Sequence, residues 1–441
     1  MLKWSKYNLV SDIESGMLLY NTATGNVIKV TDETYLKVLK RLIDNEVEED
    51  TFNDKECEIL NEFVQKKVLV DSKTNELDLL TYIYNNQITR NNILELTLII
   101  TRQCNYRCVY CYEEHLDLSM SKDVYQSILK LLEKVYLSGQ YSGVSISLFG
   151  GEPLLEYDDV LEFLKSAYDI SYKNDKTFIV SATTNGSLLF PERFLELHKL
   201  NCRHYQITID GLKETHDSYR VATDNNGWDR IIENLKFMES TDLSFDVTLR
   251  TNFNDEILEN VSEFYSFISK NFGQRFNIYY EEIKRLGGES DSEINVLDHV
   301  SANSSMVDIA SMLKTYCIKS NVCSDRLLPF SHICQATKYN SFIIDYDGTL
   351  LKCTLDFNSL NNKIGRLTKD GDMWIDHEKH CKWLTVGFEN NTKCQKCKLL
   401  PLCFGRRCVS SALESKSLSC NPDLEEIFLM EQIKSYYCKE Y

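Results

Sequence analysis

The stretch Cys104-Asn105-Tyr106-Arg107-Cys108-Val109-Tyr110-Cys111 places three thiols at CxxxCxxC spacing. It directly follows the apolar run 96–100, which predicts a buried strand. Three thiolates on one short loop can hold three corners of an iron–sulfur cube, and the iron without a protein ligand can bind a substrate or cofactor. A structural zinc site takes four ligands and would have to recruit one from elsewhere. The spacing alone leaves both kinds of site open.

Composition limits the classes of protein to consider. With 441 residues, the chain is long enough for two or three domains. Its formal net charge of −17 and the lack of a basic stripe argue against nucleic acid as a partner. The N-terminus lacks the apolar segment of a signal peptide and no run reaches membrane-span length, so we expect a cytoplasmic location. In a reducing cytoplasm, 16 cysteines favour metal or cluster ligation over disulfides.

Residues 1–75 predict a small domain of strands and helices. Strand-like runs at 17–20 and 27–30 flank a turn, and a helix follows from about Asp32. Asn53 and Glu56 form the pattern of a capping box for a second helix, and 68–70 predicts a strand. This order resembles a winged helix, which could bind a peptide along a sheet edge, although a plain N-terminal cap is the alternative. Residues 76–92 are expected to be a linker.

From residue 93 the pattern alternates between strands and helices. This alternation predicts a partial (β/α)6 barrel over residues 93–305, because parallel strands need helical crossovers. The segment 284–305 is expected to be a linker or mobile loop. Residues 306–441 are expected to hold a hairpin turned at Asp347-Gly348 and a closing helix at 421–437. The expected strands are 94–101, 143–149, 177–183, 204–210, 244–250 and 276–282, with helices near 119–138, 157–172, 191–200, 228–239 and 256–270.

Polar and glycine-rich segments follow successive strands of this barrel. They are Gly150-Gly151-Glu152-Pro153, Thr183-Thr184-Asn185-Gly186 and Thr208-Ile209-Asp210-Gly211, the last followed by Arg220. Each segment by itself is equally typical of an ordinary turn. Barrel chemistry lies on loops after the carboxyl ends of strands, where the thiol loop also lies. We therefore expect these segments to form one site.

Taken together, these motifs resemble the radical S-adenosylmethionine (radical SAM) superfamily over residues 94–283. The resemblance implies a [4Fe–4S] cluster on Cys104, Cys108 and Cys111, whose open iron chelates S-adenosylmethionine. It also implies a 5′-deoxyadenosyl radical formed by reductive cleavage inside a closed barrel. In this family the segment Gly150-Gly151-Glu152-Pro153 would contact the methionyl amino group, and Thr208 with Arg220 would bind the methionyl carboxylate. The other residues implied to bind the cofactor are Tyr110, Thr183, Asn185, Asp210 and, more weakly, Arg250.

The C-terminal cysteines resemble a SPASM domain, which carries auxiliary [4Fe–4S] clusters. The resemblance implies three clusters in all, one binding S-adenosylmethionine and two auxiliary. The first auxiliary set would be Cys334, Cys353 and Cys408, completed by Cys323 or Cys317 or left open for a substrate thiolate. The second would be Cys394, Cys397, Cys403 and Cys420. One departure is that four residues separate Cys403 from Cys408, where the usual pattern has three. A pair of zinc sites is the alternative.

The resemblance implies a maturase of ribosomally made peptides. It would hold a leader segment on the N-terminal module and take electrons from a flavodoxin or ferredoxin. The favoured product is a thioether cross-link, followed by a carbon–carbon cross-link; no general base is assigned. An anaerobic sulfatase maturase is the rival enzyme, disfavoured because Thr354 stands after Cys353, where that group commonly has Asp. A zinc-stabilised peptide-binding protein without catalysis is the rival from another class.

Overall fold

The computed structural model describes residues 1–44, 51–90, 92–272, 275–320, 322–331, 333–388, 391–405, 408–415, 420 and 422–437. These residues form two compact units. Unit 1 contains Met1–Arg90, Cys323–Cys334 and Thr385–Tyr441, and unit 2 contains Asn91–Val322 and Gln335–Leu384. The predicted ranges divide the chain differently, because they assign everything after residue 305 to one C-terminal domain.

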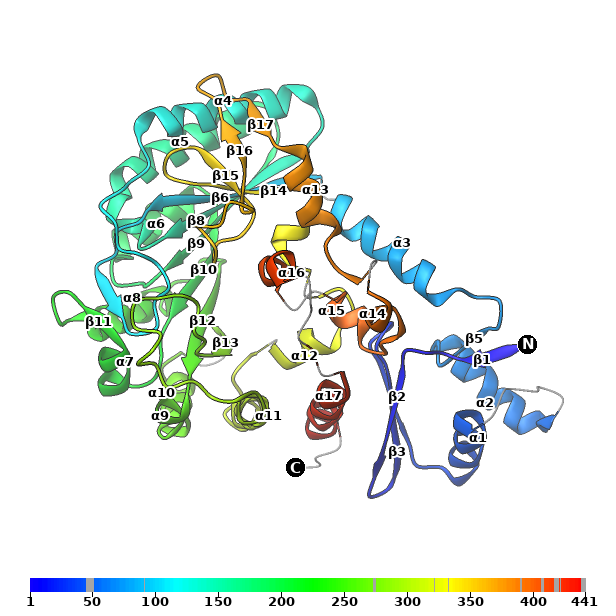
Figure 1. Ribbon diagram of the computed structural model, residues 1–441. Helices are drawn as coiled ribbons and strands as arrows, with labels where there is room; N and C mark the ends of the chain where they lie inside the picture. The colour runs from blue at the N-terminus through cyan, green and yellow to red at the C-terminus, as the bar shows by residue number, and fades with distance from the viewer. Residues whose placement is uncertain are drawn as a thin grey trace. The chain divides into compact units, whose positions relative to one another are not determined.

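Six parallel strands form the centre of unit 2, and all six confirm the strands expected from sequence (Figure 1). They lie side by side in chain order. Leu94, Leu98 and Ile99 of the first strand are fully buried, as expected for a strand covered on both faces. The strands are β6 (Ile93–Thr101), β8 (Gly143–Gly150), β9 (Thr177–Thr184), β10 (Cys202–Thr208), β12 (Asp246–Phe253) and β13 (Asn277–Glu282).

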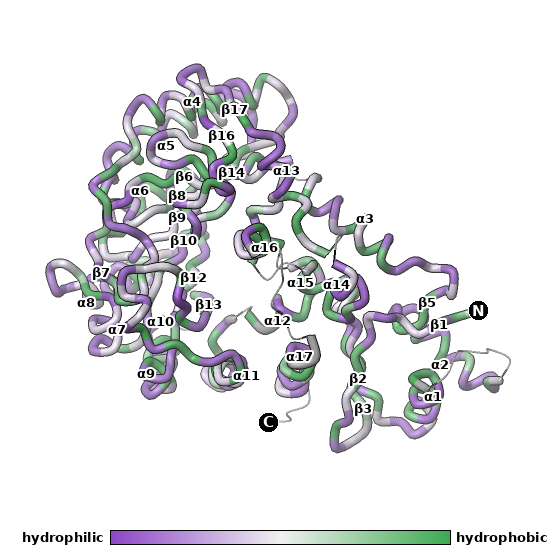
Figure 2. Tube along the Cα trace, viewed as in Figure 1, coloured by the Kyte–Doolittle hydropathy of each residue, from purple (hydrophilic) through white to green (hydrophobic). Residues whose placement is uncertain are grey.

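Amphipathic helices connect these strands, as the sequence predicts. Hydrophilic and hydrophobic residues alternate along their turns in Figure 2. In α4, for example, Ser121 caps the N-terminus and Gly139 ends the helix with a φ of 67°, while Ile128 and Leu132 face the core. The connecting helices are α4 (Lys122–Ser138), η2 (Pro153–Glu156), α5 (Tyr157–Lys173), α6 (Pro191–Lys199), α7 (Lys213–Tyr219), α8 (Gly227–Glu239), α9 (Asp255–Leu258) and α10 (Val261–Phe272).

The expected hairpin of residues 339–352 extends this sheet instead of lying in a separate domain. Strand β14 (Ser341–Ile344) pairs parallel with β6, and Gly348 turns the chain into β15 (Thr349–Leu351) with a φ of 87°. Strands β16 (Lys363–Leu367) and β17 (Met373–Ile375) continue the sheet to ten strands, followed by α13 (His377–Thr385). The sheet is therefore mixed, with an antiparallel extension on a parallel core.

The N-terminal part of unit 1 contains each element expected from sequence. Strands β3 (Gly16–Asn21) and β4 (Asn26–Val30) form the hairpin, followed by α1 (Glu33–Asp44), α2 (Asp54–Gln65) and β5 (Leu69–Asp71). The capping box of Asn53 and Glu56 is present. Two further strands, β1 (Leu2–Trp4) and β2 (Asn8–Ile13), pair with β5 and β3. The winged-helix arrangement itself stays a prediction.

The linker expected at residues 76–92 is wrong for most of its length. Helix α3 (Glu76–Thr89) occupies it, with Asn75 as the N-cap. Leu80, Tyr84 and Ile88 are buried at intervals of four residues. The helical spacing is weak in the sequence because other apolar residues, among them the exposed Leu79 and Tyr82, point away from this buried face.

The expected linker at 284–305 is also partly wrong, because α11 (His299–Thr315) begins inside it, capped by Asp298. The closing helix is confirmed as α17 (Pro422–Tyr437). No helix in the described part of the chain is both long and apolar enough to cross a membrane. The remaining short helices are α12 (Val322–Leu327), η3 (Gln335–Thr337), α14 (Thr392–Lys396), α15 (Leu400–Cys403) and α16 (Val409–Ser415).

Candidate active site at the carboxyl edge of the parallel sheet

The thiol loop begins three residues after β6 ends and contains a short strand of its own. This strand, β7 (Tyr106–Cys108), pairs antiparallel with β11 (Arg220–Ala222). The pairing sets Arg220 directly opposite Cys108. Strand pairing thus joins Arg220, more than a hundred positions away in sequence, to the thiol loop. No local sequence pattern predicts this contact.

Gly150 and Gly151 allow the end of β8 to pack against the backbone that leads into the thiol loop. A Cβ at Gly151 would lie 2.1 Å from the carbonyl oxygen of Gln103, and one at Gly150 would lie 2.3 Å from that of Thr101. Gly151 N donates a hydrogen bond of 2.9 Å to the Thr101 oxygen, and Glu152 N donates one of 2.8 Å to the Gln103 oxygen. The two glycines therefore position the thiol loop, because no side chain fits between the segments.

Glu152 is a fully buried carboxylate that organises the end of the next strand. It accepts hydrogen bonds from Leu154 N (3.0 Å), Asn185 N (2.7 Å) and the Thr184 hydroxyl (2.8 Å). Burial raises the pKa of this carboxyl group, and the donors around it act in the opposite direction. The hydroxyl that reaches Glu152 belongs to Thr184; the predicted Thr183 pairs with Gln206 of β10 through the backbone.

The predicted Asn185 joins the thiol loop to the turn after β9. Its amide Nδ2 donates to Asn105 Oδ1 at 2.8 Å, and its Oδ1 accepts from the amide and hydroxyl of Ser187. Asn105 Nδ2 donates in turn to the Ser187 hydroxyl at 3.1 Å. Asn105 lies directly after Cys104, so this triangle of side chains restrains the first thiol.

A second buried network gathers Tyr110, Asp210 and Arg220. The Tyr110 hydroxyl donates to the Asp210 carboxylate, and Arg220 Nη1 donates to the Tyr110 oxygen at 2.8 Å. Asn252 joins the two, because its backbone N–H donates to Asp210 at 2.7 Å and its Nδ2 donates to Tyr110 at 3.1 Å. Burial raises the pKa of Asp210, and Arg220 opposes that shift. Three residues predicted separately from sequence thus form one charged cluster.

The other predicted polar residues border this network. Thr208 is paired with Arg250 in the register of β10 and β12, and Arg250 Nε donates to Asn252 Oδ1 at 2.9 Å. His216 is fully buried, and its Nδ1 accepts from Asp210 N at 3.2 Å. Burial holds the pKa of His216 well below its usual value, so the ring is neutral. Sequence analysis missed Asn252, which no motif marks.

The thiols themselves show a recurring backbone feature that suits metal ligation. The N–H two residues further along the chain hydrogen-bonds the sulfur of Cys104, Cys111, Cys353, Cys397 and Cys403. Such bonds favour the thiolate that metals require. Burial nevertheless raises the pKa of Cys104 to about 12 and that of Cys111 to about 11, so thiolates here need a compensating cation. The donor set therefore fits a metal cluster.

The predicted second auxiliary set gathers in unit 1. Cys394 lies on α14, Cys397 follows that helix, and Cys403 ends α15. Cys394, Cys397 and Cys420 each raise the pKa of Cys403, which burial brings to about 11, so all four thiols share one electrostatic environment. Within the described residues, no group of three or more His, Cys, Asp or Glu side chains is arranged to hold a single metal ion.

The predicted first auxiliary set is divided between the two units. Cys334 and Cys408 are exposed residues of unit 1, whereas Cys353 belongs to unit 2. Cys353 is positioned by Asn362, whose Oδ1 accepts from Cys353 N at 2.8 Å and whose Nδ2 donates to Cys353 O at 2.8 Å. Cys317 is exposed in unit 2, and the side chain of Cys323 lies outside the described part of the chain. This set stays a prediction.

The part of the chain that contains the thiol loop and the two buried networks is similar to a known family. Residues 98–265 match the radical SAM superfamily, whose members are enzymes that use a [4Fe–4S] cluster and S-adenosylmethionine in radical reactions. A radical SAM cyclopropyl synthase (TigE) of Paramaledivibacter caminithermalis is 26% identical over 266 residues, which cover 51% of this chain and 55% of the relative. The chain therefore matches little more than half the length of that relative.

Two longer similarities extend beyond this region. A cysteine-type anaerobic sulfatase-maturating enzyme of Clostridium novyi is 23% identical over 321 residues, covering 68% of this chain and 83% of the relative. Streptococcus suis SuiB, solved bound to its precursor peptide SuiA, superposes with a TM-score of 0.54 at 17% identity and covers 94% of this chain and 97% of SuiB. At 17% identity, the similarity to SuiB shows a shared fold.

Proposed function

We propose, from the premise that residues 98–265 are a radical SAM domain, that this chain is a maturase that installs a cross-link in a ribosomally made precursor peptide. The observation that carries the proposal is the backbone pairing of Arg220 with Cys108. It sets a buried guanidinium, suited to a carboxylate, beside three thiols that leave one iron without a protein ligand.

Cys104, Cys108 and Cys111 would hold the cluster, which supplies one electron to cleave bound S-adenosylmethionine and generate a hydrogen-abstracting adenosyl radical. Arg220 and Thr208 would bind the methionyl carboxylate. The methionyl amino group is assigned to main-chain oxygens of the segment Gly150–Glu152, since the Glu152 carboxylate already accepts the hydrogen bonds described above. Tyr110, Asp210 and Asn252 keep Arg220 in place, and Arg250 borders the same network.

The other parts of the chain would serve the peptide and the electrons. The strands and helices of residues 1–75 would hold a leader segment by adding a strand to a sheet edge. Coverage of 94% of this chain by a protein solved with its precursor peptide supports that role. Two auxiliary [4Fe–4S] clusters on the C-terminal cysteines would bind a substrate thiol or accept an electron, and a cytoplasmic flavodoxin or ferredoxin would be the external donor.

A thioether is the favoured cross-link, because an open iron of the first auxiliary cluster could bind a substrate thiolate, and a carbon–carbon bond is the next candidate. The name of the cyclopropyl synthase relative, which implies carbon–carbon bond formation, supports the second product. Either cross-link removes two hydrogens from the peptide. Only the thioether also removes one thiol that iodoacetamide can alkylate.

Anaerobic reconstitution with iron and sulfide tests the proposal. We expect about twelve irons per chain, four in each of three clusters, and 5′-deoxyadenosine after reduction in the presence of S-adenosylmethionine. A chain that takes up about four irons or fewer, or that never cleaves S-adenosylmethionine, refutes the three-cluster maturase. A peptide encoded beside this gene, incubated with the enzyme, should lose about two mass units, one for each hydrogen removed.

Formylglycine formation on a sulfatase is the second candidate, favoured by the sulfatase-maturating relative that covers 68% of this chain. Thr354 after Cys353 argues against it, because a hydroxyl is a poor general base compared with a carboxylate. A zinc-stabilised binding protein predicts zinc uptake without cleavage of S-adenosylmethionine, so the same reconstitution separates it from both enzymes. The two enzymes are separated by their substrate, which is the neighbouring precursor peptide for one and a sulfatase peptide for the other.

A further inference from the structure

The loop of residues 284–298, between β13 and α11, is held in shape by its own arginine. Arg285 Nε donates to the carbonyl oxygen of Asp291 at 2.8 Å, and Nη2 donates to that of Ile294 at 3.1 Å. The Asp291 carboxylate accepts from Gly287 N at 2.6 Å. A segment that looked like a linker in the sequence is therefore an internally braced loop with a defined tip.

The tip of this loop lies against the thiol loop. A Cβ at Gly288 would lie 2.2 Å from the carbonyl oxygen of Cys111 and 3.3 Å from the Cα of Tyr112. The two backbones touch with no space for a side chain between them. Any ligand that settles at the base of the loop is therefore one short segment away from the proposed cluster.

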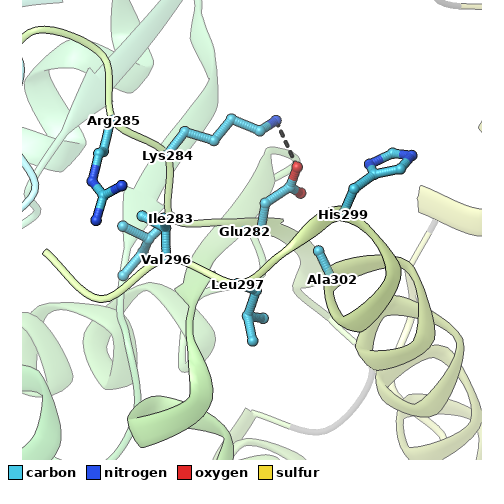
Figure 3. Close-up of a pocket in the computed structure, with 8 residues that line it drawn as sticks. All are labelled: Glu282, Ile283, Lys284, Arg285, Val296, Leu297, His299 and Ala302. Atoms are coloured by element: carbon cyan, nitrogen blue, oxygen red, sulfur yellow. Dashed lines mark ion pairs between the residues drawn. The ribbon is translucent and has the colours of Figure 1, made fainter. Parts of the chain in front are cut away.

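A pocket of about 330 Å³ opens at the base of the same loop (Figure 3). Its two walls come from the end of β13 and from the segment that returns into α11. Lys284 and Glu282 extend toward each other on its rim, 3.0 Å apart. The apolar lining is supplied by Ile283, Val296, Leu297 and Ala302.

The chemistry of this lining selects one class of ligand. The apolar walls favour an aliphatic or aromatic side chain, and the volume, at the lower end of the range for ligand pockets, suits one such group. Arg285 and His299 also line the pocket, and Lys284 pairs with both Glu281 and Glu282. The positive charges of Lys284 and Arg285 are thus balanced by the two carboxylates, and the rim offers donors and acceptors without a strong net charge. A peptide bond has the matching acceptor and donor, whereas a charged side chain would leave one of these ions unpaired.

We propose that this pocket binds an apolar side chain of the substrate peptide together with the peptide bonds that flank it. This inference rests on the proposed function for the identity of the substrate but not for the presence of the site. The same loop that forms the pocket touches Cys111 through Gly288, so the loop connects the bound residue to the proposed cluster site. The pocket is then a specificity site for a residue next to the modified one.

Binding of small diamides tests the inference on the full-length, reconstituted chain. The probes are N-acetyl-leucine methylamide, N-acetyl-lysine methylamide and N-acetyl-glutamate methylamide, measured by saturation-transfer NMR. We expect the leucine compound to bind about tenfold more tightly than either charged one. Leu297→Trp, which fills the pocket, should weaken binding of the leucine compound by about the same factor.

Val300→Trp is the matched control, because Val300 is 52% exposed on α11 and does not line the pocket. It should bind the leucine compound like the unmodified chain. If Leu297→Trp lowers the unfolding temperature, Val296→Phe is used in its place, because it fills the pocket from another position. Equal binding of the three diamides, or unchanged binding in both filling variants, overturns the inference. Cleavage of S-adenosylmethionine is scored separately, so its absence refutes the proposed function, while selective diamide binding still supports the pocket.

Discussion

The thiol loop of unit 2 and the cysteines of unit 1 (Cys394, Cys397, Cys403 and Cys420) differ in the charged groups that surround them. Cys104, Cys108 and Cys111 lie among buried ions, since Arg220 and Glu152 both act on the pKa of Cys104. The strongest electrostatic neighbours of Cys394 and Cys403 are the other thiols of their own set. Four thiols suffice to close a cluster, whereas three need charged groups that recognise the ligand on the open iron.

The backbone that carries the thiols also differs between the two regions. The thiol loop is seated between strand ends, where Gly151 excludes any side chain, and its Arg220 arrives through strand pairing. The set in unit 1 is carried by the short helices α14 and α15 and by left-handed residues at Phe404 and Gly405. The proposed open site is therefore built on long-range strand pairing, whereas the proposed four-thiol site is built on local turns and short helices.

Removing the thiols of each region should give the largest contrast. Replacing Cys104, Cys108 and Cys111 with Ala should abolish 5′-deoxyadenosine formation, because these thiols are the proposed ligands of the S-adenosylmethionine-binding cluster. Replacing Cys394, Cys397 and Cys403 should remove about four irons but leave some uncoupled cleavage. Iron content and product by chromatography are the measurements. Cleavage that survives the first triple substitution contradicts the assignment.

Adding one methyl group to a glycine of each region gives the next contrast. Gly151→Ala should destabilise unit 2 by about 3 kcal/mol, because its Cβ would strike the Gln103 carbonyl at 2.1 Å. Gly405→Ala should cost only about 1 kcal/mol for a φ of 68°, since its closest new neighbours, the Cys394 sulfur and Phe388 N, would lie at 3.1 Å. Urea denaturation with iron analysis measures both. Equal costs would mean that the thiol loop is not seated by close backbone packing.

Neutralising one carboxylate near each region should separate buried from surface electrostatics. Asp210→Asn should cost about 2 kcal/mol, because the buried Arg220 and the Tyr110 hydroxyl lose a charged partner. Glu426→Gln should cost less than about 0.5 kcal/mol, since its contact with Lys398 at 3.4 Å is partly exposed. Both changes keep the shape of the side chain. A neutral result for Asp210→Asn would show that the network is not an electrostatic unit.

Acidification should lower the stability of unit 2 through His380, and this loss is smallest near neutral pH. Burial and Lys352 lower the pKa of His380 to about 4, so between pH 6.5 and 4 the unfolded chain binds more protons than the folded one. Stability from this group is full above pH 6.5 and is lost as the pH falls toward 4. His380→Gln should flatten this acid loss, monitored by fluorescence of the neighbouring Trp383, which is buried beside it in α13. An unchanged pH profile would contradict the assignment.

Local sequence patterns were enough for most elements of the fold. All six parallel strands and the capping box of Asn53 lie where the hydrophobic periodicity and cap residues predict them. The failures came where apolar residues do not mark a single helix face. Helix α3 was mistaken for a linker because its apolar residues include the exposed Leu79 and Tyr82 as well as the buried face, and α11 was missed because it begins in a polar stretch. Strand β14 was assigned to another domain because pairing with β6 is invisible to local periodicity.

The functional groups of the candidate site can be read from the sequence: three thiols after a buried strand, glycines and polar groups after the following strands, and a second group of cysteines near the C-terminus. Which of these groups are in contact follows from the tertiary structure. Asn252 joins Tyr110 to Asp210, Arg220 lies opposite Cys108, and Gly288 touches Cys111. The physical reason is that these contacts depend on strand register and crossover geometry, which bring together residues that no local periodicity links.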